Sequence, residues 1–224
     1  FIFMNAAGTH RNVTTMCHEG GHAMHTFLTN NEPLIHYRDT PSEMAETASM
    51  SMELFTSGLW NKFYDEKDHV RARREHLEDI ISFFPWCATV DAFQHWIYLN
   101  PDHTVEQRDD YFDELNKRFT SGLVNWEGYD HHRRNKWQQQ LHIFGMPFYY
   151  VEYGIAQLGA LQMYRLFKQN PEAALEGYIK GLSLGSSKPL PEVWDTMGIK
   201  FDFSEGTLKE LVEFVQKELA ELQD

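Results

Sequence analysis

Two histidines four residues apart, with a glutamate directly after the first, dictate the local structure near the start of this chain. Residues 18 to 22 read His-Glu-Gly-Gly-His. Side chains four positions apart lie on one face of an α-helix, so both imidazoles can approach a single Zn²⁺ at about 2.0–2.1 Å. The intervening Glu19 points to the side, where it can act as a general base. The motif therefore predicts a helix that carries a metal site.

A carboxylate from a second helix can supply the third ligand. The segment Pro-Ser-Glu-Met-Ala-Glu at 41–46 offers Glu43 and Glu46, and Glu46 follows His22 by 24 positions. That length is enough to end one helix, turn and pack another helix against it. Helical spacing alone does not decide between Glu43 and Glu46 as the ligand. Glu53 lies farther along and is better placed to support a ligand than to be one.

The motif helix contains three further residues that need an explanation. Gly20 and Gly21 each destabilise a helix by about 1 kcal/mol relative to Ala. Close approach of a neighbouring backbone or of a substrate is the simplest compensation, and a loosely wound helix end is the alternative. His25 lies three positions after His22 and could be a competing ligand. Only the pair at 18 and 22 brackets a glutamate, so we interpret His25 as a packed or hydrogen-bonding histidine. The remaining histidines, among them His36, His131 and His132, are expected at the surface or in loops, without a metal.

Capping residues and apolar periodicity predict a chain that is overwhelmingly α-helical, without internal repeats. The N-cap candidates are Asn12 or Thr14, Ser42, Thr104, Asn170 and Ser204. Pro85 is expected to kink or interrupt a long helix, and Phe1 to Met4 to form a short strand. The expected helices span residues 12–28, 42–63, 68–99, 104–119, 137–144, 148–167, 171–184 and 191–197, with a last helix after Ser204.

Composition limits the class of protein. Hydrophobic residues make up 42% of the chain and charged residues 24%, without an apolar run long enough to span a bilayer. The net charge of -13 repels phosphate and anionic lipids, so we expect neither nucleic acid nor a membrane as partner. Cys17 and Cys87 are too few for a disulfide framework, which favours a reducing, cytoplasmic setting. We expect one large soluble domain over residues 1–224, and the start at Phe1 suggests a piece of a longer protein.

A second group of residues with chemical potential lies at 142–153, where the sequence reads His-Ile-Phe-Gly-Met-Pro-Phe-Tyr-Tyr-Val-Glu-Tyr. Phenol and imidazole donors can stabilise the negative charge that develops on a carbonyl oxygen during peptide-bond hydrolysis. Tyr150 and Tyr153 are three positions apart on the expected helix, so both hydroxyls could reach one cleft. From spacing alone, an ordinary aromatic core is an equally good interpretation.

In their order along the chain, these motifs resemble peptidase family M3, the thimet oligopeptidase and oligoendopeptidase F group, and most closely its oligoendopeptidase F branch. The resemblance spans almost the whole chain. Its parts are the residues 1–9, 18–23, 45–49 with Glu53, 147–153 and 181–198. Gly20 departs from the family pattern, in which a larger apolar residue is usual at that position. This departure concerns helix packing rather than metal binding.

The resemblance implies a mainly α-helical, zincin-like catalytic domain of the gluzincin type around a deep channel, with one Zn²⁺ per chain. It also implies that residues 1–224 are the C-terminal catalytic portion of an M3-type peptidase, without the preceding lobe. Phe1 to Gly8 would form an edge strand that pairs with the bound peptide. The metal ligands that it implies are His18, His22 and Glu46. The catalytic and substrate-binding groups that it implies are Glu19, His142, Tyr150 and Tyr153.

The function implied by the resemblance is a zinc-dependent endopeptidase that cleaves short oligopeptides. Folded proteins would be excluded by the channel. One alternative is a zinc exopeptidase of the peptidyl-dipeptidase or carboxypeptidase type, which needs a group to hold the terminal carboxylate. The other alternative is a non-catalytic, metal-stabilised helical domain. A structural zinc site has four protein ligands, whereas only three can be named here.

Overall fold

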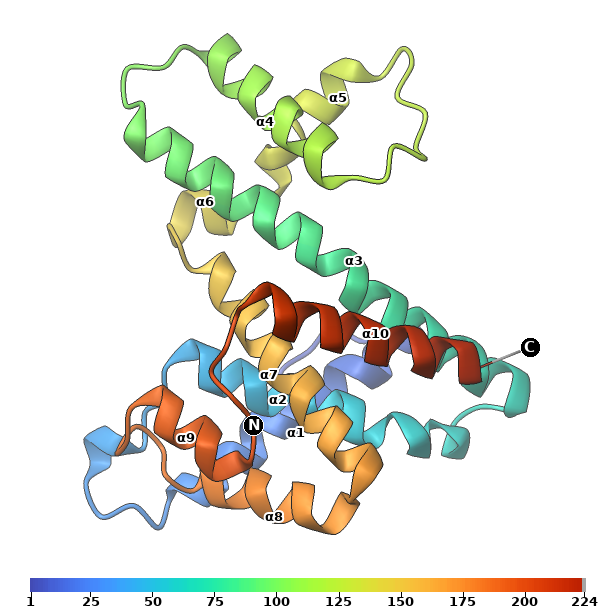
Figure 1. Cartoon of the computed structure of the whole chain (residues 1–224), viewed down its shortest axis with the longest axis vertical. Coiled ribbons are helices and arrows are strands. Elements are labelled where there is room, and N and C mark those ends of the chain that lie inside the picture. The colour runs from blue at the N-terminus through green and yellow to red at the C-terminus, as the bar shows by residue number, and fades with distance from the viewer. Residues whose placement is uncertain (223–224) are drawn as a thin grey trace. The chain divides into compact units, whose positions relative to one another are not determined.

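The structure of this chain is a computed structural model, which describes residues 1–222. All of the regular structure in these residues is helical (Figure 1). The prediction of a mainly α-helical chain is confirmed. The α-helices are α1 (His10–Thr29), α2 (Ser42–Thr56), α3 (Glu66–Leu99), α4 (Val105–Phe119), α5 (Asp130–Arg134), α6 (His142–Gly145), α7 (Tyr150–Gln169), α8 (Pro171–Leu182), α9 (Leu190–Met197) and α10 (Glu205–Glu221). Three short 3₁₀-helices are η1 (Ile35–Tyr37), η2 (Ser57–Lys62) and η3 (Lys136–Gln139).

The predicted strand at the start of the chain is not formed. Residues 1–7 are irregular, and residues 1–222 contain no β-strand. A strand is stabilised by backbone hydrogen bonds to a neighbouring strand, and the described part of the chain offers none to Phe1 to Met4. The same holds for the edge strand expected as far as Gly8. Gly8 instead adopts a positive φ of 74° directly before Thr9, the N-cap of α1.

Three predicted N-caps are confirmed by their hydrogen bonds. The Thr104 hydroxyl accepts from the Gln107 backbone N–H at 3.2 Å at the start of α4. The Asn170 side chain accepts from the Ala173 N–H at 3.1 Å at the start of α8. The Ser204 hydroxyl accepts from the backbone N–H of residue 207 at 3.4 Å at the start of α10. Each bond satisfies an N–H group that the first helical turn leaves without a partner.

The caps predicted at Asn12 or Thr14 and at Ser42 are wrong. α1 begins at His10 with Thr9 as its N-cap, and α2 begins at Ser42 with Pro41 as its N-cap.

Other helix boundaries also differ from the predicted ones. α3 continues through Pro85 from Glu66 to Leu99, so the interruption considered there does not occur. α7 begins at Tyr150 rather than at Phe148, because Phe148 has a φ of 63°. That left-handed conformation is incompatible with a right-handed helix. The expected helix over residues 137–144 is divided between η3 and α6.

The chain forms two compact units. The first unit comprises residues 1–78 and the residues from 155 onward, and the second comprises Asp79–Gly154. The core of the first unit is built by α2, α7, α8 and α9 around the fully buried Trp194. The core of the second unit is a largely aromatic cluster. Its buried members are Phe93, Phe112, Leu115 and Trp137.

In the first unit α1 and α2 lie side by side (Figure 1) and are in backbone contact at Gly21. A Cβ atom on Gly21 would lie 2.5 Å from the Ser49 Cα and 3.0 Å from the Ala48 carbonyl oxygen. The predicted close approach of a neighbouring backbone is therefore found at Gly21. Gly20 has nothing within 4 Å of its Cβ position, so no close packing explains that glycine. The Tyr178 hydroxyl of α8 donates to the same Ala48 carbonyl oxygen at 2.7 Å and ties α2 to α8.

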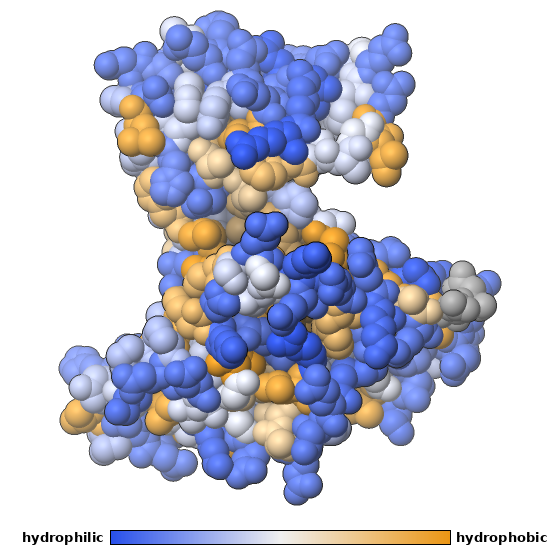
Figure 2. Space-filling model, viewed as in Figure 1, coloured by the Kyte–Doolittle hydropathy of each residue, from blue (hydrophilic) through white to orange (hydrophobic). Residues whose placement is uncertain are grey.

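Hydrophilic residues predominate over α4 and α5 on the face shown in Figure 2. Within residues 1–222, no helix combines the length and the apolar character that crossing a bilayer requires.

The contact at Gly21 gives a first prediction. Gly21→Ala should lower the free energy of unfolding of the metal-free chain by about 1–3 kcal/mol, because the added methyl group forces α1 and α2 apart. Gly20→Ala is the matched control. It should raise the stability by up to about 1 kcal/mol, since Ala is the better helix former and its methyl group meets open space. Urea denaturation followed by circular dichroism measures both, and equal stabilities of the two variants would contradict this packing.

Candidate metal centre

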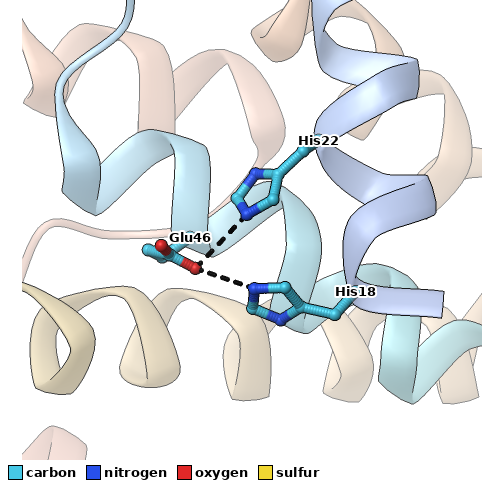
Figure 3. Close-up of side chains that lie close together, drawn as sticks. All are labelled: His18, His22 and Glu46. Atoms are coloured by element: carbon cyan, nitrogen blue, oxygen red, sulfur yellow. Dashed lines mark ion pairs between the residues drawn. The ribbon is translucent and has the colours of Figure 1, made fainter. Parts of the chain in front are cut away.

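α1 and α2 bring the three predicted ligands to one point (Figure 3). The Glu46 Oε2 atom lies 3.2 Å from the Nε2 of His18 and 3.7 Å from the Nε2 of His22. All three ligand atoms lie within 4.8 Å of one another. Tetrahedral bonds of about 2.0–2.1 Å to Zn²⁺ place neighbouring ligand atoms roughly 3.4 Å apart. The observed separations therefore suit a small divalent ion.

A metal ion needs several histidine, cysteine or acidic side chains close together. Among the described residues, a single group of three such side chains meets this requirement, and it consists of His18, His22 and Glu46. Glu43 does not belong to it, although spacing alone could not separate Glu43 from Glu46. His25 does not belong to it either. The His25 ring is buried, and burial together with the charge of His22 lowers its pKa to about 4. This agrees with the interpretation of His25 as a packed, neutral histidine.

Glu46 is held in place by its own helix. The Ser49 hydroxyl, one turn farther along α2, lies 3.0 Å from the Glu46 Oε2 and 3.1 Å from the Glu46 backbone oxygen. Both residues are buried. Sequence analysis did not single out Ser49. The available signal was its spacing of three residues from a candidate ligand, which puts a hydroxyl beside the carboxylate on the same helix face.

Glu53 supports His18 from the side opposite to the site. Its Oε1 lies 2.6 Å from the Nδ1 of His18. A carboxylate that binds one imidazole nitrogen fixes the ring orientation and leaves the other nitrogen to face the metal. The supporting role that the position of Glu53 predicts agrees with this geometry.

The charges of the site are strongly coupled. Burial lowers the pKa of His18, but the hydrogen bonds and charges of Glu46 and Glu53 outweigh it and raise that pKa to about 10. Burial likewise raises the pKa of Glu46, but the ion pair with His18 outweighs it and holds that pKa below its ordinary value. Burial lowers the pKa of His22. In the metal-free chain at neutral pH, His18 is therefore an imidazolium between two carboxylates.

Glu19 follows His18 on α1 and does not belong to the group of three ligands. Its side chain is partly exposed. Its negative charge acts on the His22 imidazole, which places the carboxylate near the site without making it a ligand. A carboxylate in this position is free to exchange protons with water or with a substrate.

The second unit brings His142, Tyr150 and Tyr153 together. The Tyr153 hydroxyl lies 3.4 Å from the His142 Nε2, and the ring centroids of His142 and Tyr150 are 5.2 Å apart. Tyr150 and Tyr153 pack edge to face with centroids 5.6 Å apart. Burial, with the nearby Cys87, raises the pKa of Tyr150 to about 12. The Tyr150 hydroxyl thus stays protonated at neutral pH and can donate a hydrogen bond.

Comparison with known proteins defines the class to which this fold and site belong. Residues 1–213 match peptidase family M3. The chain therefore belongs to peptidase family M3, and the resemblance noted from the sequence motifs is confirmed.

Individual relatives point to the oligoendopeptidase F branch of the family. The oligoendopeptidase F homolog of Borreliella burgdorferi is 28% identical over 185 residues, which are 80% of this chain and 30% of that protein. Oligopeptidase PepF of Bacillus subtilis is 25% identical over 205 residues, 89% of this chain and 30% of that protein. The solved structure of PZ peptidase A with inhibitor 2 has a TM-score of 0.90 at 30% identity. The matched region includes 99% of this chain and 39% of that chain. The chain thus spans about a third of the length of these relatives.

The raised pKa of His18 predicts that metal binding releases a proton. The pKa of about 10 lies well above neutral pH, so a metal ion must displace a proton from the imidazolium. Binding of Zn²⁺ near pH 7 should therefore release about one proton, and the apparent affinity should rise about tenfold per pH unit while His18 remains protonated. Calorimetric titration in buffers of different ionisation enthalpy measures the proton count. Binding without proton release would contradict the charge state assigned to His18.

Proposed function

We propose that this chain is the catalytic portion of a zinc-dependent endopeptidase that hydrolyses internal bonds of short oligopeptides. The observation that carries the proposal is the convergence of two imidazole nitrogens and one carboxylate oxygen within 4.8 Å. Membership of peptidase family M3 supports it, as do the names of its relatives, an oligoendopeptidase F homolog and an oligopeptidase. Three protein ligands leave the fourth tetrahedral position open, which is typical of a catalytic rather than a structural zinc site.

In this proposal each residue has a separate task. His18, His22 and Glu46 hold the ion, which when bound supplies Lewis acidity that makes water more acidic and polarises a carbonyl group. Glu19 takes a proton from the attacking water and later delivers it to the leaving amine. Because Glu19 sits beside the ligand group rather than in it, its carboxylate oxygens remain available for both transfers.

The aromatic group of the second unit is proposed to bind substrate. Hydrolysis places negative charge on the former carbonyl oxygen, and a protonated phenol stabilises such an oxyanion by donating a hydrogen bond. The raised pKa of Tyr150 supports this task. The hydrogen-bond distance between Tyr153 and His142 supports a shared role for these two side chains.

We further propose that the protein works in the cytoplasm on short peptides rather than on nucleic acid or membranes. Cys17 and Cys87 are both free thiols, which suits a reducing compartment. The net charge of -13 disfavours polyanionic partners.

A polar pocket beside His22 favours exopeptidase activity as a second candidate. The pocket has a volume of about 90 Å³ and is lined by Arg38, Thr40 and the buried His25, among others. A guanidinium group in such a pocket is suited to a terminal carboxylate. Cleavage rates of matched peptides with free and amidated C-termini separate the two activities. An exopeptidase requires the free carboxylate, whereas an endopeptidase cleaves both.

The role of Glu19 can be tested by a substitution that keeps its shape. Glu19→Gln removes the basic oxygen, and we expect turnover of a quenched-fluorescent peptide to fall about 10²- to 10⁴-fold. Bound zinc should remain at one ion per chain, since Glu19 is not one of the three ligands. Metal analysis and the peptide assay, with and without chelator, measure both quantities. Unchanged turnover would refute the assignment of the base.

A matched pair of substitutions on α2 tests the third ligand. Glu46→Gln should weaken zinc binding by more than about 100-fold, because a direct ligand matters more than the supporting residues, whose loss costs 10- to 100-fold. Glu43→Gln removes the same charge one turn earlier and should leave the affinity within about twofold. Competition with a chromophoric chelator measures the affinities. Equal losses in the two variants would mean that net charge, not ligation, controls binding.

A further inference from the structure

The carboxylate of Glu53 lies between two imidazole rings. Its Oε1 is 2.6 Å from the Nδ1 of His18, and its Oε2 is 3.6 Å from the Nε2 of His76. His76 is part of α3, so a third helix contributes a side chain next to the carboxylate that supports His18. The sequence-based expectation that the remaining histidines lie at the surface or in loops is wrong for His76, which is buried on α3.

Burial makes the second contact necessary. The side chain of Glu53 is only 15% exposed and that of His76 only 10%. A buried carboxylate is unfavourable unless both of its oxygens find partners. His18 satisfies one oxygen of Glu53, and His76 is the side chain that faces the other.

Core packing fixes the position of His76. Its ring packs edge to face against Trp60 of η2, with ring centroids 5.4 Å apart. Trp60 is almost completely buried and packs in turn against His10 at the start of α1, at 4.9 Å. His76 therefore faces the oxygen of Glu53 from α3, with a ring whose position is fixed by Trp60 and, through Trp60, by His10.

We propose that His76 is a positioning residue of the metal centre, which acts by holding Glu53 against His18. The terminal torsion of a glutamate side chain is soft, and one hydrogen bond leaves the carboxylate free to rotate about it. The ion-pair contact of the other oxygen with His76, at 3.6 Å, favours one orientation of the carboxylate. The Nε2 of His18 is then kept directed at the metal position. The inference rests on the proposed function only in that the site binds a metal ion.

The chain offers a matched control on the same helix. His69 lies seven positions before His76 on α3 and is also buried. Within the described residues, the ion pairs of the Glu53 carboxylate are those with His18 and His76, not with His69. Loss of either buried imidazole disturbs α3, but only loss of His76 releases Glu53.

The experiment compares zinc affinities of single and double variants of the full chain by chelator competition. His76→Phe keeps a ring against Trp60 but removes the nitrogen, and should weaken Zn²⁺ binding about tenfold, at the lower end of the losses known for supporting residues. His69→Phe should change the affinity less than twofold. His76→Gln retains an N–H near the Nε2 position and should restore most of the affinity.

A double variant that combines His76→Phe with Glu53→Gln distinguishes loss of positioning from a general loss of structure. In the Glu53→Gln background, His76→Phe should cause no further loss of zinc affinity, because the group that it positions is already removed. A tenfold loss of zinc affinity that persists in that background would overturn the inference. So would an equal loss of affinity in His69→Phe, or a chain that binds no zinc. Peptide cleavage is measured separately. The expected pattern of affinities without any cleavage would refute the proposed peptidase function and leave the role of His76 intact.

Discussion

Backbone contact between α1 and α2 at Gly21 sets the distance between the imidazoles of one helix and the carboxylate of the other. A side chain at this position would collide with the backbone at Ser49, three residues beyond Glu46. The small residues at the contact let the helices approach until Glu46 reaches both His18 and His22, at 3.2 and 3.7 Å. The Tyr178 hydroxyl, hydrogen bonded to the Ala48 carbonyl, anchors α2 in that position.

Charge balance explains why so polar a site can lie between packed helices. Two partly buried carboxylates, Glu46 and Glu53, flank the His18 ring. Without metal, the raised pKa of His18 supplies a positive charge between them. The divalent ion of the proposed function would replace that proton and bring a larger positive charge to the same place. Ser49 and His76 add polar contacts to the two carboxylates, so that neither relies on a single partner.

The two compact units contribute different chemistry to the proposed reaction. The first unit holds His18, His22 and Glu46, the proposed metal ligands, and the adjacent Glu19, the proposed base. The second unit holds His142, Tyr150 and Tyr153 in mutual contact, and its buried phenol offers a neutral hydrogen-bond donor.

By itself the sequence determined the features that depend on neighbouring residues. The spacing of His18 and His22 put both rings on one helix face, and Thr104, Asn170 and Ser204 each marked a helix start. These features follow from the local geometry of a helix, which a short stretch of chain contains completely.

Tertiary structure decided everything that depends on the contact between elements. Spacing left Glu43 and Glu46 equivalent, and only the packing of α1 on α2 brings Glu46 to the histidines. The tertiary structure also places His76 beside Glu53, and it offers residues 1–7 no strand to pair with. A one-turn change in how two helices meet exchanges one side chain for another at the contact, and no local pattern records that register.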